Sequence, residues 1–236
     1  MIVGITRVRN ESLIIADTLR HYLRHCDHIV LFDDASTDKT PDIAANFPEV
    51  TVLRSFDWRA DRQAEETRHR ALLLDAANNL GADWVLCFDA DERLVGELPE
   101  LTANGYRFRL FDGYMTVDYS EPYQDGPLAD LPRKWGPEYR DILMLFRPDC
   151  AEYIGRDMRE PIVSGDIRLV DVQVKHYGKC LSVSQWEETC QYYAEHFPEP
   201  YRSKWRARKG KAIHHESDFG RPLYDWDELG TVAVRL

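Results

Sequence analysis

The sequence predicts an α/β fold with a mainly parallel central sheet and helices on both faces. Over residues 1–90, short apolar runs typical of buried strands alternate with segments in which apolar residues recur at helical spacing. Strands joined by helical crossovers run parallel and are covered by helices. Three of the apolar runs are followed by polar loops, and the carboxyl ends of parallel strands are where such folds bind ligands.

The expected elements follow from apolar spacing and from residues that start or stop helices. Thr40 and Pro41 are typical of an N-cap and a first helical position, and Gly81 is a typical helix stop. In the first part, strands are expected at 2–6, 28–32, 50–53 and 84–88, and helices at 13–23, 40–46 and 60–80. Beyond residue 93, strands are expected at 106–110, 142–146 and 167–174, a loop rich in Pro, Gly and aromatic residues at 112–137, a helix at 185–197, and then an irregular C-terminal portion.

Composition narrows the class of protein. A chain of 236 residues can bury a core without disulfides, and no linker divides it, so one domain is expected. The formal net charge of −11 argues against general affinity for nucleic acids. No apolar run reaches the roughly 20 residues of a membrane span, and no signal-type segment opens the chain. Five scattered cysteines without a Cys-x-x-Cys pair favour a reduced, cytoplasmic protein.

One basic segment departs from the acidic balance. Residues 202–211 contain six lysines and arginines around Trp205. A segment of this kind is most often a solvated surface. The alternative is contact with a diphosphate, an anionic acceptor or the inner face of a membrane, which would make the protein peripheral to that membrane.

The end of the expected strand 84–88 carries three carboxylates within four positions. If the backbone stays extended past Phe88, Asp89 and Asp91 leave it on the same side and point to one spot beyond the sheet. Paired hard oxygen ligands suit Mg²⁺ or Mn²⁺. The alternative is that these acidic residues only cap a strand and open a turn. The sequence contains neither the dinucleotide-binding nor the P-loop glycine motif.

Three motifs in order resemble the signatures of family 2-like glycosyltransferases. They are Arg-Asn-Glu at 9–11, Leu-Phe-Asp-Asp-Ala-Ser-Thr-Asp at 31–38 and Phe-Asp-Ala-Asp-Glu at 88–92. Arg68 and Ala71 resemble a further element, in which His69 replaces the usual Asn. This resemblance covers residues 1–95.

The second half resembles the lipopolysaccharide-core subset of that family. The similar stretches are Leu-Phe-Arg-Pro at 145–148, Tyr-Ile-Gly at 153–155, Arg-Glu-Pro at 159–161 and Lys-His-Tyr-Gly at 175–178. Arg159 stands where that pattern usually has His. The resemblance implies a GT-A type fold, with a nucleotide-sugar-binding half at 1–95, an acceptor and catalytic half at 96–180, and a helical and irregular extension at 181–236.

The resemblance also implies an activity. A hexose would move from a nucleotide-diphosphate sugar, with a UDP-sugar favoured, to a hydroxyl of a glycan, a lipid-linked or a small-molecule acceptor. Mn²⁺ or Mg²⁺ on Asp89, Asp91 and His176 would stabilise the departing diphosphate. The alternative for His176 is a packed strand-end histidine with a hydrogen bond. The residues implied to bind the donor are Arg7, Arg9, Asn10, Asp33, Asp34, Arg68 and Asp89.

Several of these roles have structural alternatives. The loop 33–38 is also typical of a turn held by Asx and Ser/Thr side-chain bonds, and Arg68 is also explained as a surface arginine. Glu160 is the expected general base, because it matches a family glutamate and a carboxylate is the usual base for a hydroxyl. Asp157 is the fallback. A single displacement with Glu160 as base would invert the anomeric carbon.

Two other classes of protein compete with this interpretation. A nucleotidyltransferase would use the same sheet, metal and nucleotide, but it usually carries a glycine-rich basic loop after the first strand, and residues 7–11 contain no glycine. A non-catalytic nucleotide- or sugar-binding module is the second alternative.

Overall fold

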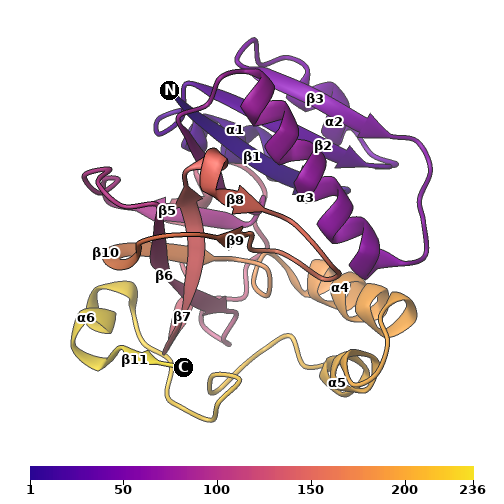
Figure 1. Cartoon of the computed structure of the whole chain (residues 1–236). Helices are drawn as coiled ribbons and strands as arrows, with labels where there is room; N and C mark the ends of the chain where they lie inside the picture. The colour runs from indigo at the N-terminus through magenta and orange to yellow at the C-terminus, as the bar shows by residue number, and fades with distance from the viewer. The chain divides into compact units, whose positions relative to one another are not determined.

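The structure, a computed structural model, describes residues 1–236 (Figure 1). The backbone forms two compact units, and each is discontinuous in sequence. The first unit contains Met1–Asp91, Gly96–Phe108 and Ile142–Val172, and the second contains Glu92–Val95, Arg109–Asp141 and Gln173–Leu236. No helix is long and apolar enough to cross a bilayer.

The first unit is built on a parallel sheet with the strand order β3-β2-β1-β4. Its strands are β1 (Ile2–Val8), β2 (His28–Asp34), β3 (Val50–Ser55) and β4 (Trp84–Cys87). β1 pairs in parallel with β2 and β4, and β2 pairs in parallel with β3. β4 also pairs antiparallel with the end of β7 (Lys134–Phe146), so the sheet is mixed but mainly parallel. The α/β class predicted from the sequence is confirmed.

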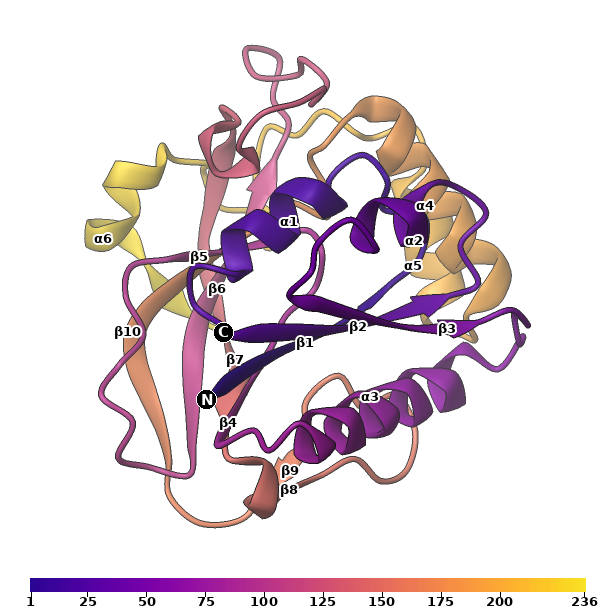
Figure 2. The same cartoon turned by 90° about the horizontal axis from the view of Figure 1, so that it is seen from above.

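Helices cover both faces of this sheet. α1 (Ile15–Tyr22) and α2 (Thr40–Ala44) lie on one face, and α3 (Arg62–Asn79) lies on the other (Figure 2). The C-terminal half of α3 buries Leu73 and Leu74 in the core with alternate residues of the strands, as the period of two in a strand requires.

The opposite face is close-packed through an aromatic stack and a glycine. The rings of Tyr22 and Phe88 are parallel and 3.6 Å apart. A Cβ on Gly4 would lie 3.0 Å from side-chain atoms of both Ile29 and Phe88. A side chain at position 4 would therefore separate the helix layer from the sheet.

The helix starts differ slightly from the sequence prediction. Thr40 is the first residue of α2 rather than its N-cap, which is Lys39. The side chain that holds this end is Asp38, because its Oδ1 accepts the Thr40 amide at 2.9 Å. Asp61 caps α3 in the usual way and accepts the Ala64 amide at 3.2 Å.

The second unit combines strand segments with a helical hairpin. β5 (Glu92–Val95) pairs antiparallel with the end of β10 (Ile167–His176), and β11 (Val234–Arg235) pairs in parallel with β7. α4 (Val183–His196) packs on α5 (Tyr201–Arg208), with the Tyr193 and Trp205 rings stacked 4.6 Å apart. The remaining short elements are η2 (Pro148–Cys150), β8 (Ala151–Glu152) and β9 (Ile162–Val163) of the first unit, and η1 (Leu128–Asp130), η3 (Trp226–Glu228) and α6 (Leu229–Val232) of the second.

The expected loop 112–137 is shorter than the sequence indicates. β6 (Gly105–Tyr114) runs to Tyr114 and β7 begins at Lys134, so both strands enter the expected loop. Gly113 is a packing residue here and not a turn residue, since a Cβ on it would lie 2.9 Å from Cys180 Sγ. The helix α5 was also not expected, because its polar sequence has no helical periodicity and its packing partner is α4.

Candidate functional site

The loops that follow β1 and β2 are fastened to one another by side chains. The Asn10 amide donates to Ser36 Oγ at 2.9 Å, and Asn10 Oδ1 accepts the Thr37 amide at 2.8 Å. The Ser12 amide donates to Asp38 Oδ2 at 3.0 Å. Asn10 has a φ of 56°, a left-handed conformation that asparagine tolerates better than most residues. The side chains of Ser36 and Asp38 thus fasten this loop to the loop after β1, and a contact between the loop 33–38 and a nucleotide stays a prediction.

Two buried carboxylates end β2 beside these loops. Asp33 and Asp34 are each 0% exposed. Asp34 Oδ2 accepts Arg7 Nη2 at 2.7 Å and is also bonded to Arg62. Arg54 Nε lies 3.2 Å from Asp33 Oδ2, but this ion pair lacks hydrogen-bond geometry, and Asp34 Oδ1 and both Asp33 oxygens have no donor. Buried carboxylate oxygens normally accept hydrogen bonds, and these three oxygens accept none here.

Arg7 and Arg9 hold this edge of the sheet together. Arg7 Nε donates to His69 Nδ1 at 3.1 Å, and its Nη1 is bonded to Glu66. With its bond to Asp34, Arg7 thus joins β1, β2 and α3. Arg9 Nη1 donates to the Asp34 backbone oxygen at 3.1 Å, and its guanidinium lies 5.3 Å from the Trp58 ring centroid. Both arginines lie where the sequence predicts, and their contact with a donor stays a prediction.

His69 is a buried neutral histidine in the middle of this network. Its ring is 0% exposed and stacks on Phe32 at 4.0 Å. Arg7 donates to Nδ1, and Nε2 lies 2.7 Å from Arg68 Nη2 and 3.1 Å from Glu65 Oε2. Burial, followed by the charges of Arg7 and Arg68, lowers the pKa of His69 to about 3.

This histidine makes stability depend on pH. The unfolded chain protonates a histidine near pH 6.5, whereas folded His69 stays neutral until about pH 3. The unfolded state therefore binds more protons between these values, and folding is destabilised as pH falls through this window. We expect the free energy of unfolding, measured by urea titration from pH 7 to pH 4.5, to fall less steeply in His69→Asn than in the wild type. Equal slopes in the two proteins would contradict this assignment.

Arg68 is paired within its own helix. Its Nε and Nη2 donate to Glu65 at 3.1 and 2.6 Å, and the hydrogen bond to Glu65 raises the pKa of Arg68. The Arg68 side chain is 40% exposed. The predicted contact between Arg68 and a diphosphate stays a prediction.

The chain turns after β4, so the strand alternation expected for Asp89 and Asp91 does not apply. β4 ends at Cys87, and a turn at Ala90 and Asp91 leads into β5. The condition for that alternation, an extended backbone past Phe88, is therefore not met, because Ala90 and Asp91 form a turn. Strand geometry alone does not aim the two carboxylates at one point.

Asp89 is held between two arginines. Its Oδ1 accepts Arg70 Nη2 at 2.7 Å, and its Oδ2 accepts Arg159 Nε at 3.0 Å. Burial alone would raise the pKa of Asp89, but the charges of Arg159 and Arg70 outweigh it and hold this pKa well below its usual range. The Asp89 carboxylate is thus charged, with an arginine nitrogen at each oxygen.

The predicted metal ligands do not form a preassembled cation site. No group of three or more His, Cys, Asp or Glu side chains in the chain could hold a metal ion. Asp89 faces two cationic side chains, which compete with a metal for its oxygens. Asp91 is half-buried in the turn. Mg²⁺ often takes one or two carboxylates plus substrate phosphates, and the role of Asp91 as a metal ligand stays a prediction.

His176 belongs to the second unit, whereas Asp89 and Asp91 belong to the first. His176 Nδ1 lies 2.6 Å from Asp112 Oδ1. Asp112 also accepts Lys179 Nζ at 2.9 Å and Arg140 Nη2 at 2.8 Å. The hydrogen-bonded strand-end histidine, the alternative considered for His176, is present, and its role as a metal ligand stays a prediction.

The loop that carries Glu160 is tied to α3. The Asp157 amide donates to the Gln63 backbone oxygen at 2.9 Å, and Gln63 Nε2 donates to Asp157 Oδ2 at 3.1 Å. Glu160 Oε2 lies 2.9 Å from Arg107 Nη2, and the Glu160 side chain is 28% exposed. Glu160 follows Arg159, so the residue predicted as base is next in sequence to one that binds Asp89.

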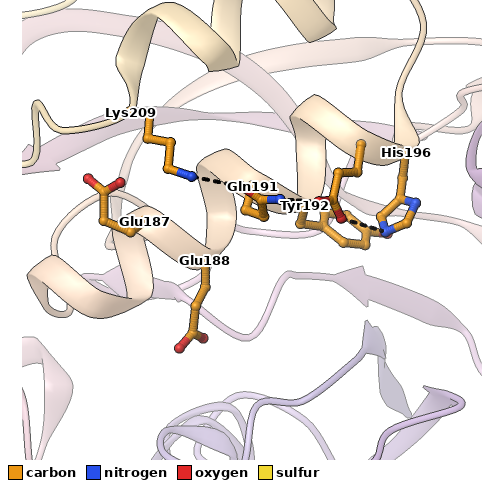
Figure 3. Close-up of a pocket in the computed structure, with 7 residues that line it drawn as sticks. Glu187, Glu188, Gln191, Tyr192, His196 and Lys209 are labelled. Carbon is orange, nitrogen blue, oxygen red and sulfur yellow. Dashed lines mark hydrogen bonds and ion pairs between the residues drawn. The ribbon is translucent and has the colours of Figure 1, made fainter.

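A shallow hollow of about 400 Å³ occurs on α4 (Figure 3). It belongs to the second unit, and of the residues singled out in the sequence it contains only Lys209 of the basic segment 202–211. Its lining residues are Glu187, Glu188, Gln191, Tyr192, Glu195, His196 and Lys209. These are side chains on an open helix surface, and the hollow is not the candidate site.

The sequence reasoning missed the polar half of α3. Arg62, Glu66 and Arg70 bind Asp34, Arg7 and Asp89, yet none was singled out. The available signal was their spacing, because residues 62, 66 and 70 lie on one helix face. A helix that covers an apolar sheet is expected to be apolar on the covering face. Charged residues on one face of the first half of α3 therefore indicate that this half reaches past the sheet edge.

Comparison with known proteins matches residues 5–103 to the family model described as Glycosyl transferase family 2. The uncharacterized proteins Mb3815c of Mycobacterium bovis and Rv3786c of Mycobacterium tuberculosis are each 36% identical to the chain over 96 residues. Each match covers 38% of this chain and 23% of the relative, so the chain spans less than a quarter of the length of these curated relatives.

Two solved structures are similar at low sequence identity. HddC from Yersinia pseudotuberculosis is 12% identical with a TM-score of 0.42, over 81% of this chain and 99% of HddC. A 4-diphosphocytidyl-2C-methyl-D-erythritol synthase is 14% identical with a TM-score of 0.37, over 62% of this chain and 75% of the synthase.

The family match supports the resemblance found in the first half of the sequence, at the level of the whole family. It does not single out the lipopolysaccharide-core subset. The matched region includes the loops after β1, β2 and β4, which lie at the carboxyl ends of adjacent parallel strands. The Glycosyl transferase family 2 model thus matches the part of the chain that carries these three loops.

Proposed function

We propose that this chain is a glycosyltransferase that moves a hexose from a nucleotide-diphosphate sugar to an acceptor hydroxyl. The observation that carries the proposal is the edge formed by β1, β2 and β4. Three loops of a family 2 domain meet there, and buried Asp33 and Asp34 present oxygens that lack donors. Ribose hydroxyls and base N–H groups are donors of the kind these oxygens can accept. A UDP-sugar is the favoured donor.

The catalytic part of the proposal assigns Glu160 as the general base. Its carboxylate would take the proton of the acceptor hydroxyl as that oxygen attacks the anomeric carbon, with Asp157 as the fallback. A single displacement of this kind inverts the anomeric centre. The acceptor would be a glycan, a lipid-linked glycan or a small molecule.

The metal part of the proposal rests on Asp91. When bound, Mn²⁺ or Mg²⁺ would supply Lewis-acid stabilisation of the departing diphosphate. Asp91 would hold the ion together with phosphate oxygens, and Asp89 would stay paired with Arg70. His176, which is expected from the sequence as the third protein ligand of the ion, is included in this proposal.

A thermal-shift panel tests the donor site. We expect UDP or another nucleoside diphosphate at ~100 times its dissociation constant to stabilise the fold by about 2.7 kcal/mol. Mn²⁺ should increase this shift in the wild type and not in Asp91→Ala. The matched control is Asp75→Ala, because Asp75 is an exposed carboxylate of α3 outside all the motifs.

The panel also separates the competing classes of protein. Absence of stabilisation by every nucleotide, with and without Mn²⁺, would contradict the proposal. Release of pyrophosphate from a nucleoside triphosphate would identify a nucleotidyltransferase, since a glycosyltransferase releases a nucleoside diphosphate. Nucleotide binding without turnover of any nucleotide sugar would identify the protein as a non-catalytic binding module.

A further inference from the structure

Arg159 and Arg70 hold the same carboxylate but differ in how firmly the protein fixes them. The Arg70 side chain is 3% exposed. Besides Asp89, it donates to Glu66 Oε1 at 2.8 Å and to Cys87 Sγ at 3.1 Å. The Arg159 side chain is 28% exposed, and Asp89 itself is 31% exposed. Arg70 is therefore a fixed anchor for Asp89, whereas Arg159 approaches the same carboxylate from the solvent side.

The backbone keeps Arg159 close to this edge of the sheet. Just before Arg159 in the sequence, the Met158 amide donates to Thr67 Oγ1 at 3.1 Å, and the Asp157 amide donates to the Gln63 backbone oxygen. Residues 153–161 contain no helix or strand, and the backbone here is held by these bonds to α3 and by Tyr153 Oη, which donates to the Arg159 backbone oxygen at 3.4 Å. A guanidinium on such a tether can change partner without a change in the fold.

Arginines surround Asp89 and its neighbour Glu66. Arg70 and Arg159 pair with Asp89, and Arg70 and Arg7 pair with Glu66. Arginine matches phosphate oxygens through its planar fork of N–H groups. An anion of higher charge than a carboxylate would compete well for the partly exposed Arg159 side chain.

We propose that Arg159 is a donor-binding residue whose guanidinium exchanges Asp89 for the diphosphate of the nucleotide, while Arg70 keeps Asp89 in place. This inference rests on the proposed function and adds to it the residue that distinguishes a diphosphate from a monophosphate. No covalent step is involved. The exchange neutralises charge on the leaving group with a protein side chain, in addition to any metal that Asp91 holds.

The test compares UDP with UMP by isothermal titration calorimetry, in EDTA and then in Mn²⁺. Loss of a charge-assisted hydrogen bond is expected to weaken UDP binding to Arg159→Gln by roughly 10- to 100-fold. UMP affinity should change little, so the UDP/UMP preference falls. The UDP affinity of Arg159→Lys should lie between those of the wild type and Arg159→Gln, because lysine keeps the positive charge but lacks the planar fork of N–H groups.

Arg156→Gln is the matched control. Arg156 lies in the same loop, and its replacement by Gln removes the same charge. Its partner, however, is the exposed Asp61, at 2.7 and 2.8 Å. We expect its UDP/UMP preference to equal that of the wild type. The ratio of UDP affinity to UMP affinity within one variant is insensitive to a small change in the folding stability of that variant.

The outcomes separate the two proposals. A wild-type preference for UDP that persists unchanged in Arg159→Gln overturns the role of Arg159 and leaves the glycosyltransferase proposal standing. Equal losses in Arg159→Gln and Arg156→Gln also overturn it, because they reveal only a general charge effect. If the wild type binds neither UDP nor UMP, and neither GDP nor GMP in the same assay, the proposed function fails as well.

Discussion

Replacing Glu160 with Gln is expected to lower kcat by roughly 10²- to 10⁴-fold, the usual contribution of a general base. Gln has nearly the same shape as Glu but cannot accept a proton. Dissociation constants for the nucleotide should stay close to those of the wild type, because Glu160 pairs with Arg107 and not with a proposed donor-binding residue. Steady-state kinetics together with calorimetric titration of UDP measure the two effects separately.

The matched variant is Asp157→Asn, three residues earlier in the same loop. Asp157 accepts a bond from Gln63, and that contact can survive in Asn. We expect its kcat to remain within a few-fold of the wild type. A full loss in Asp157→Asn with normal turnover in Glu160→Gln would transfer the role of base to Asp157. An equal reduction of nucleotide affinity and kcat in Glu160→Gln would indicate a structural role through its ion pair with Arg107.

Replacing Arg70 with Ala is expected to destabilise the fold by about 3 kcal/mol, the lower end of the cost of breaking a buried ion pair. Arg70 is 2% exposed, and its loss removes bonds to Glu66, Cys87 and Asp89. The loss of stability stays at the lower end of this range because Glu66 remains bonded to Arg7 and Asp89 remains bonded to Arg159. Urea titration at pH 7 measures this change in the free energy of unfolding.

Arg156→Ala provides the comparison for Arg70→Ala. The Arg156 and Asp61 side chains are 58% and 51% exposed. Exposed pairs contribute roughly 0–1 kcal/mol, so this variant should unfold at nearly the wild-type midpoint. Similar losses in the two variants would contradict the view that Arg70 is a buried anchor.

The sequence alone predicted the α/β class and the edge of the sheet at which the motifs meet. Both follow from local signals. Alternating apolar runs identify the strands β1, β2 and β4, and helical spacing between them implies parallel pairing. Parallel pairing then brings residues 9–11, 31–38 and 88–92 to one edge, whatever the details of packing.

The tertiary structure decided which partners the charged residues of that edge take. Nothing in the sequence indicates that Arg70 and Arg159, 89 positions apart, bind the same carboxylate of Asp89. The turn after Cys87 and the polar half of α3 decide this, because an ion pair depends on distance and burial in three dimensions. Hydrophobic periodicity is a local property of the chain, so it specified the strands and helices, while the electrostatics of the candidate site required contacts between distant segments.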